Sequence, residues 1–123
     1  MSKLTIVDSN FLITDEANIR EAMEAITDNQ RGSVVVVDNK NHLVGVVSDG
    51  DIRRALLKGA TLFTSVQDVV NMHPRYISNG PKSDKEAEKI FSDDLSVMIM
   101  PVVDSKNTVV DIAFRNPEIR KEL

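Results

Sequence analysis

Residues 35–44 read VVVDNKNHLV and residues 101–110 read PVVDSKNTVV, so nearly the same stretch occurs twice, 66 positions apart. Each copy joins an apolar run to a second apolar run through a polar turn, which is typical of a β-hairpin. Smaller matches upstream support the repeat at an offset of 64, with Ile13-Thr14 against Ile77-Ser78 and Ile26 against Ile90. A unit of roughly 60 residues is too long for a solenoid repeat. The sequence therefore predicts two similar units around one core.

The pattern of each unit predicts a strand, a helix, two strands and a second helix. In the first unit we expect strands at residues 11–13, 33–37 and 43–47, a helix capped by Thr14 or Asp15, and a helix ending near Lys58-Gly59. In the second unit we expect strands at 75–77, 97–103 and 108–114, a helix capped by Ser83 with Glu86 in a capping box, and a helix starting at Asn116-Pro117. The predicted class is α+β, with a small sheet covered by helices in each unit. We assign residues 1–62 to the first unit and residues 63–123 to the second.

Two local features refine this prediction. The first helix carries Ile19, Ala22, Met23 and Ile26 at helical spacing, and Gly32 is a candidate left-handed cap after it. Four consecutive valines at residues 34–37 indicate a strand that is buried on both faces. The repeat then predicts a pseudo-two-fold arrangement with symmetric clefts between the units, which is a favourable place for ligands.

The strongest candidate site lies in residues 43–58, LVGVVSDGDIRRALLK, where a predicted strand turns into a helix. Ser48 precedes Asp51 by three residues, so the two can form a capping box. The same junction gathers free backbone N–H groups and the positive end of a helix dipole, which favour an anion. Gly45 within the strand indicates the close approach of a backbone or a ligand. Arg53 and Arg54 follow, either as further phosphate contacts or as solvated surface residues.

Composition narrows the function classes. The chain has 123 residues, 41% hydrophobic and 28% charged, which suits a globular domain, and it has no cysteine for a disulfide or thiolate chemistry. No apolar run approaches the roughly 20 residues of a membrane helix, and no export signal is recognisable, so we expect a cytoplasmic protein. A net charge of −4 argues against general nucleic-acid binding. The two histidines lack the spacing of a metal site, and no nucleophile–base pair or Walker loop is present, so we predict no catalytic or metal centre.

The doubled β-α-β-β-α pattern, with residues 45–52 reading GVVSDGDI at the end of its first copy, resembles a pair of cystathionine-β-synthase (CBS) domains, or Bateman module. The resemblance covers nearly the whole chain. It implies a non-catalytic regulatory module that binds AMP, ADP, ATP or S-adenosylmethionine. It further implies that Ser48 contacts phosphate, that Asp51 contacts the ribose hydroxyls, and that the base is lined by the residues starting each repeat. Those residues are Ile13, Thr14, Ile77 and Ser78.

The second copy departs from this motif. At an offset of 66, Phe114 stands for Ser48 and Pro117 for Asp51, while a shift by one residue places Glu118 at the Asp51 position. Asp111 replaces Gly45. Phe114 is a candidate to fill this second cleft. Arg115 is either a phosphate contact in the other site or, as we favour here, a surface charge.

Two functions compete at this stage. One is the nucleotide-sensing module, and the other is a dimerisation and interaction module whose clefts are vestigial. The family resemblance implies a homodimer. It also raises the prospect of a covalently attached sugar-phosphate nucleotidyltransferase domain. Titration with the four adenosyl ligands separates the two functions.

Overall fold

The structure is a computed structural model that describes residues 10–115. Its strands are β1 (Leu12–Thr14), β2 (Ser33–Val37), β3 (Leu43–Ser48), β4 (Ile77–Ser78), β5 (Ile99–Val103) and β6 (Val109–Phe114). Its helices are α2 (Ile19–Asn29), α3 (Asp49–Leu57), the short 3₁₀ helix η1 (Val66–Asp68) and α4 (Ser83–Asp93). The helix expected from Asn116-Pro117 lies outside the described residues.

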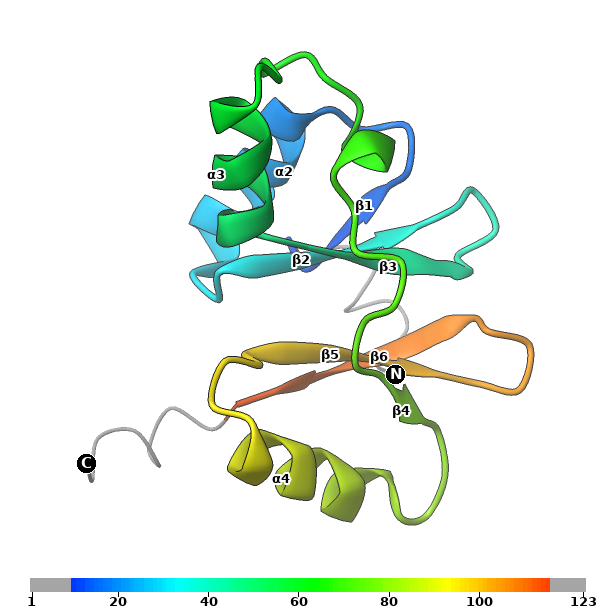
Figure 1. Ribbon diagram of the computed structural model, residues 1–123. Helices are drawn as coiled ribbons and strands as arrows, with labels where there is room; N and C mark the ends of the chain where they lie inside the picture. The colour runs from blue at the N-terminus through cyan, green and yellow to red at the C-terminus, as the bar shows by residue number, and fades with distance from the viewer. Residues whose placement is uncertain (1–9, 116–123) are drawn as a thin grey trace.

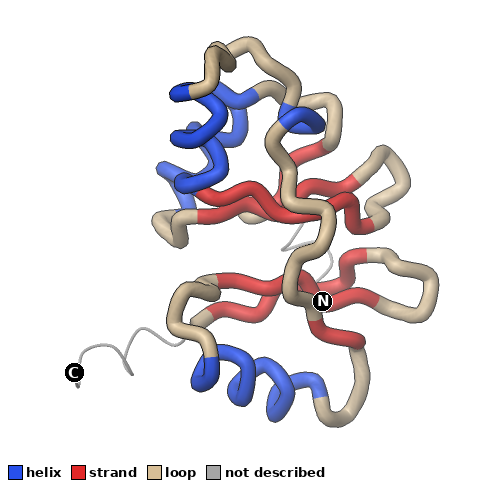
Figure 2. Tube along the Cα trace, in the orientation of Figure 1, coloured by secondary structure: helices blue, strands red, loops and turns tan. Residues whose placement is uncertain are grey.

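The strands form two three-stranded sheets, ordered β1-β2-β3 and β4-β5-β6. In each sheet the first strand pairs in parallel with the second, and the second pairs antiparallel with the third. The sheets face each other, with α2 and α3 outside the first and α4 outside the second (Figure 1). The long connection from α3 to β4 passes from one layer to the other (Figure 2). The α+β class and the paired sheets predicted from the repeat are confirmed.

The valine run shows why its strand is buried on both faces. Val34 and Val36 pack with α2 and α3, whereas Val35 and Val37 pack between the two sheets. Neighbouring strand residues point to opposite faces, so a strand covered on both sides has no polar position. In β5, Met100 and Val102 pack toward α4, while Ile99 and Val103 join the core between the sheets.

The backbone preserves the repeat at an offset of 66. Both hairpins have a register shift at the equivalent place, between Val36 and Val37 and between Val102 and Val103. Asn41 and Asn107 both have positive φ, at 68° and 66°. Each asparagine also reaches the other hairpin, since Asn41 Nδ2 donates to Val109 O at 2.9 Å and Asn107 Nδ2 donates to Leu43 O at 3.2 Å. These reciprocal bonds join the two hairpins about the pseudo-two-fold axis.

The predicted helix starts need correction. The N-cap of α2 is Asn18, in a capping box with Glu21, so the predicted caps Thr14 and Asp15 are wrong. The reason is that Asp15 N still donates to Val37 O, which keeps this part of the chain extended beside β2. For α4 the N-cap is Lys82 without a side-chain bond, and Ser83 is the first helical residue. The predicted capping box of Ser83 with Glu86 is therefore wrong, because Ser83 Oγ donates to Gly80 O at 2.9 Å instead.

Two further details of α2 differ from the prediction. Its C-cap is Gln30, with φ of 59°, rather than Gly32. Met23 is 37% exposed, and Ala25 takes its expected place among the buried residues of the helix. The buried face of α2 is therefore made of smaller side chains than the sequence pattern indicated.

No helix in the part of the chain that the structure describes is long and apolar enough to cross a membrane.

Candidate functional site

The junction between β3 and α3 has the predicted capping box. Ser48 has extended backbone angles, its Oγ accepts a hydrogen bond from Asp51 N at 3.1 Å, and Asp51 Oδ2 accepts one from Ser48 N at 3.0 Å. Asp51 Oδ1 accepts a further bond from Arg54 Nη2 at 2.9 Å. The serine hydroxyl hydrogen remains available to a ligand, and the Arg54 side chain is 65% exposed and easily displaced.

Ser48 and Asp51 open onto a cleft between the two repeats, with a volume of about 360 Å³. The cleft is lined by the end of β3 and the start of α3, by the connection before β4, and by the segment between α4 and β5. The lining residues are Ser33, Val46, Ser48, Asp51, Asn71, His73, Pro74, Arg75, Asp94, Ser96, Val97, Met98 and Ile99. The first repeat thus contributes a capped helix start, and the second contributes the facing wall.

Gly45 brings the connecting segment against β3. A Cβ at this position would overlap Asn71 O and lie 2.6 Å from Val70 Cγ2, so only glycine fits. The close approach allows Val46 and Asn71 to exchange two backbone hydrogen bonds, at 3.1 and 2.9 Å. The predicted backbone approach at Gly45 is confirmed, and its consequence is to place Asn71 at the cleft.

The wall of the cleft carries an ion pair that the sequence did not reveal. Arg75 Nη2 lies 3.8 Å from Asp94 Oδ2, and the two side chains are 53% and 36% exposed. Asp94 Oδ1 accepts bonds from Ser96 Oγ at 2.6 Å and Ser96 N at 3.0 Å. These two bonds, followed by the charges of Arg75 and Arg115, hold the pKa of Asp94 below its ordinary value of 3.8. Asp94 is consequently an ionised carboxylate at neutral pH.

Arg115 is buried, and the surface charge favoured from the sequence is wrong. It is 4% exposed. Its Nε donates to Val97 O at 3.0 Å, and its Nη2 donates to Asp94 O at 2.7 Å and to Val97 O at 2.8 Å. Its guanidinium also lies over the Phe91 ring, 5.1 Å from the centroid. Arg115 therefore fixes the backbone of the cleft wall from behind.

The remaining predicted residues are absent from the lining of this cleft. Ile77 is buried and exposed Ser78 follows it, and both line an adjoining pocket with Arg75, Glu86 and Lys89. Ile13 packs against the core beside α2, and Thr14 is exposed at the end of β1. Arg53 is exposed on α3 and is absent from the lining.

The second junction has the same backbone as the first but different side chains. Arg115 N donates to Met98 O, just as Asp49 N donates to Gly32 O, so the offset of 66 holds up to residue 115. Phe114, in the place of Ser48, packs its ring against Phe11 with the centroids 4.7 Å apart. An aromatic contact therefore stands where the first junction offers a hydroxyl.

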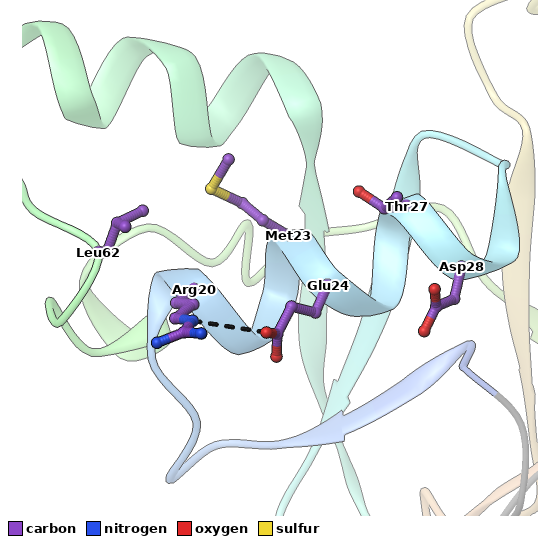
Figure 3. Close-up of a pocket in the computed structure, with 6 residues that line it drawn as sticks. All are labelled: Arg20, Met23, Glu24, Thr27, Asp28 and Leu62. Carbon is purple, nitrogen blue, oxygen red and sulfur yellow. Dashed lines mark ion pairs between the residues drawn. The ribbon is translucent and has the colours of Figure 1, made fainter.

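A larger groove lies on the outer face of α2, away from these residues. It has a volume of about 520 Å³ and is lined by Arg20, Met23, Glu24, Thr27, Asp28 and Leu62 (Figure 3). Arg20 and Glu24 form an ion pair across one helical turn at 3.4 Å, with both side chains 61% exposed. The groove has no predicted site residue and no capped helix start, so the inter-repeat cleft is the better candidate.

Sequence reasoning missed Asn71, Arg75, Asp94 and Ser96. The sequence favours a helix-end turn over a metal-ligand pair for Asp93-Asp94, and it gives Arg75 only as the start of a strand. Gly45 indicated the close approach of a backbone or a ligand, and the structure shows that the backbone of Asn71 makes this approach.

Comparison with known proteins agrees with this geometry. The CBS domain family matches residues 5–58, which include the Ser48–Asp51 junction. Residues 5–58 of this chain belong to the CBS domain family. An uncharacterised protein of Helicobacter pylori is 33% identical over 101 residues, and arabinose 5-phosphate isomerase KdsD of Francisella tularensis is 30% identical over 109. These matches cover 82% and 86% of the chain, which spans only 30% and 32% of the two relatives.

Solved structures show that the fold is that of CBS-domain pairs. The protein CBSX2 in complex with AMP has a TM-score of 0.70 at 21% identity, covering 92% of this chain and 87% of that one. A CBS domain pair/ACT domain protein of Thermotoga maritima has a TM-score of 0.72 at 22% identity, covering 99% and 96%. The cytosolic domain of the Mg²⁺ channel MgtE in complex with ATP has a TM-score of 0.66 at 22% identity, covering 91% and 44%.

Proposed function

We propose that this CBS-domain chain is a non-catalytic regulatory module that binds an adenine nucleotide or related adenosyl ligand in the cleft between its repeats. The observation that carries the proposal is the position of Ser48 and Asp51 at a capped helix start that opens onto that cleft. Two proteins of similar fold were solved with AMP and with ATP, which supports a nucleotide as the ligand.

The junction offers each group that such a ligand needs. The N-terminus of α3 and the Ser48 hydroxyl supply hydrogen-bond donors for a phosphate. Asp51 supplies a carboxylate that can accept from two ribose hydroxyls, with each charge-assisted bond contributing roughly 1.5–3 kcal/mol. Oδ1 becomes free for this role once exposed Arg54 moves away. The base-lining roles of Ile13, Thr14, Ile77 and Ser78 stay predictions, as does any phosphate contact by Arg53.

Calorimetric titration of AMP, ADP, ATP and S-adenosylmethionine into the wild-type chain and Asp51→Ala tests this proposal. The matched control is Glu21→Ala, because Glu21 closes a capping box of the same form on α2, with bonds of 3.0 and 2.9 Å to Asn18. Both variants should lose about 0.5–1 kcal/mol of stability through the cap. Only Asp51→Ala should lose affinity, by about tenfold or more.

Two results contradict the proposal in different ways. If Asp51→Ala and Glu21→Ala bind the ligand equally well, the ribose role of Asp51 is wrong. If the wild-type chain binds none of the four ligands, the adenosyl-sensing function is wrong and the interaction function takes its place.

A specific observation supports that second candidate, an interaction module. Apolar side chains at the end of α3 and in the following loop are exposed, with Leu57 at 81% and Phe63 at 77%. A homodimer through this region would bury them. Light scattering should then give twice the chain mass for the wild type and a monomer for Leu57→Glu with Phe63→Glu. A wild-type monomer would contradict it.

The relatives bear on which kind of enzyme the module regulates. The curated relatives are about three times longer than the matched region, and one of them is named as an arabinose 5-phosphate isomerase. We propose that the module controls an attached or partner enzyme acting on a sugar phosphate. A nucleotidyltransferase as that enzyme and a cytoplasmic location stay predictions.

A further inference from the structure

The charges that line the inter-repeat cleft bear on which ligand it accepts, given the adenosyl-binding function proposed above. Asp51 lies on the first-repeat side, and Asp94 and Arg75 lie on the opposite wall. Asp51 and Asp94 are both carboxylates, and Arg75 is held by Asp94. Within residues 10–115, Arg75 is the single arginine or lysine of the lining.

We propose that Arg75 is the cationic phosphate contact of the cleft, that it exchanges Asp94 for one phosphate group, and that Asp94 restricts the ligand to a nucleoside monophosphate. Arg75 can make this exchange because its bond to Asp94 is long, at 3.8 Å, and because more than half of its side chain is exposed. A guanidinium pairs with a phosphate through two parallel hydrogen bonds, which a 3.8 Å ion pair does not match.

Asp94 has no comparable freedom. Ser96 holds its Oδ1 through two bonds, and Arg115 holds its main-chain carbonyl from behind. The carboxylate therefore stays in the cleft wall when Arg75 moves to the ligand. A first phosphate would replace it as the partner of Arg75, while each additional phosphate would add negative charge beside Asp94 and Asp51. Like charges within one cleft repel each other, and partial burial strengthens the repulsion.

The test is calorimetric titration of adenosine, AMP, ATP and S-adenosylmethionine into the chain and three variants. Arg75→Ala should weaken AMP about tenfold, the equivalent of one charge-assisted bond, and leave adenosine unchanged. Arg20→Ala is the matched control, because it removes the same charge from an exposed ion pair on α2 far from the cleft. Asp94→Asn keeps an oxygen for Ser96 and removes the charge, so it should strengthen ATP several-fold more than AMP.

The outcomes separate this inference from the function on which it rests. Tighter binding of AMP than of ATP in the wild type, with the variant effects above, supports it. Tighter binding of ATP, or equal losses of adenosine and AMP in Arg75→Ala, overturns it while adenosyl binding stands. Binding of S-adenosylmethionine alone also overturns it and leaves the proposed function intact. Failure of every adenosyl ligand to bind removes both.

Discussion

Replacement of Gly45 by alanine should destabilise the chain because Val70 and Asn71 lie directly against this glycine. The added Cβ would overlap Asn71 O and lie 2.6 Å from Val70 Cγ2 and 3.0 Å from Asn71 C. Two of these neighbours are main-chain atoms, which move only if the whole segment moves. Such overpacking typically costs about 1–3 kcal/mol, and displacement of the two hydrogen bonds between Val46 and Asn71 adds about 1 kcal/mol each. We expect a total loss of about 3–5 kcal/mol in the free energy of unfolding.

Gly80→Ala is the matched control for that substitution. A Cβ at Gly80 has no neighbour within 4 Å, and its φ lies outside the left-handed region. We expect Gly80→Ala to change the free energy of unfolding by no more than about 0.5 kcal/mol. Urea unfolding followed by circular dichroism gives both values, provided that the slopes agree between variants. Losses within about 0.5 kcal/mol of each other would refute the argument that Asn71 leaves no room at Gly45.

Two further predictions concern buried and titrating groups. Arg115→Met should lower the free energy of unfolding by about 2–4 kcal/mol, because the carbonyls of Asp94 and Val97 lose a charged donor. The control Arg53→Met, at an exposed arginine, should have almost no effect. Equal urea midpoints for the two variants would contradict this prediction. The pKa of Asp38 is lowered from 3.8, chiefly by the backbone N–H of His42, so its stabilisation is complete above that value and is lost as pH falls through the folded pKa. Stability should therefore drop less between about pH 5 and about pH 3 in Asp38→Asn than in the wild type, and identical urea midpoints against pH would show that Asp38 has no such role.

Much of the fold was predictable because the repeat identifies segments far apart in the chain that form equivalent elements. The matched turns at Asp38 and Asp104 both accept backbone bonds two residues onward, from Lys40 N and Lys106 N. Two equal hairpins with fully apolar central strands can cover each other only by stacking, so the paired sheets followed from the pattern. The helix starts were harder, since several polar residues in a row can each serve as a cap. Tertiary pairing of Asp15 with Val37 decided that case in favour of Asn18.

The candidate site was predictable only on the side that one motif encodes. Ser48 and Asp51 lie three residues apart on one turn, so their bonds were a local inference. Arg75 and Asp94 meet across 19 positions, and no spacing rule connects an exposed arginine to a carboxylate at that separation. Which wall faces the motif depends on how the two sheets stack, and that is a property of the assembled core.

The two junctions also differ at the Asp49 position, where the second repeat has Arg115. Its backbone occupies the same place in the second repeat as that of Asp49 in the first, yet its side chain turns inward to the carbonyls of Asp94 and Val97. Those residues form the wall opposite Ser48 and Asp51. The second repeat thus uses this position to support the wall of the first cleft, whereas the first repeat has the exposed Asp49 there.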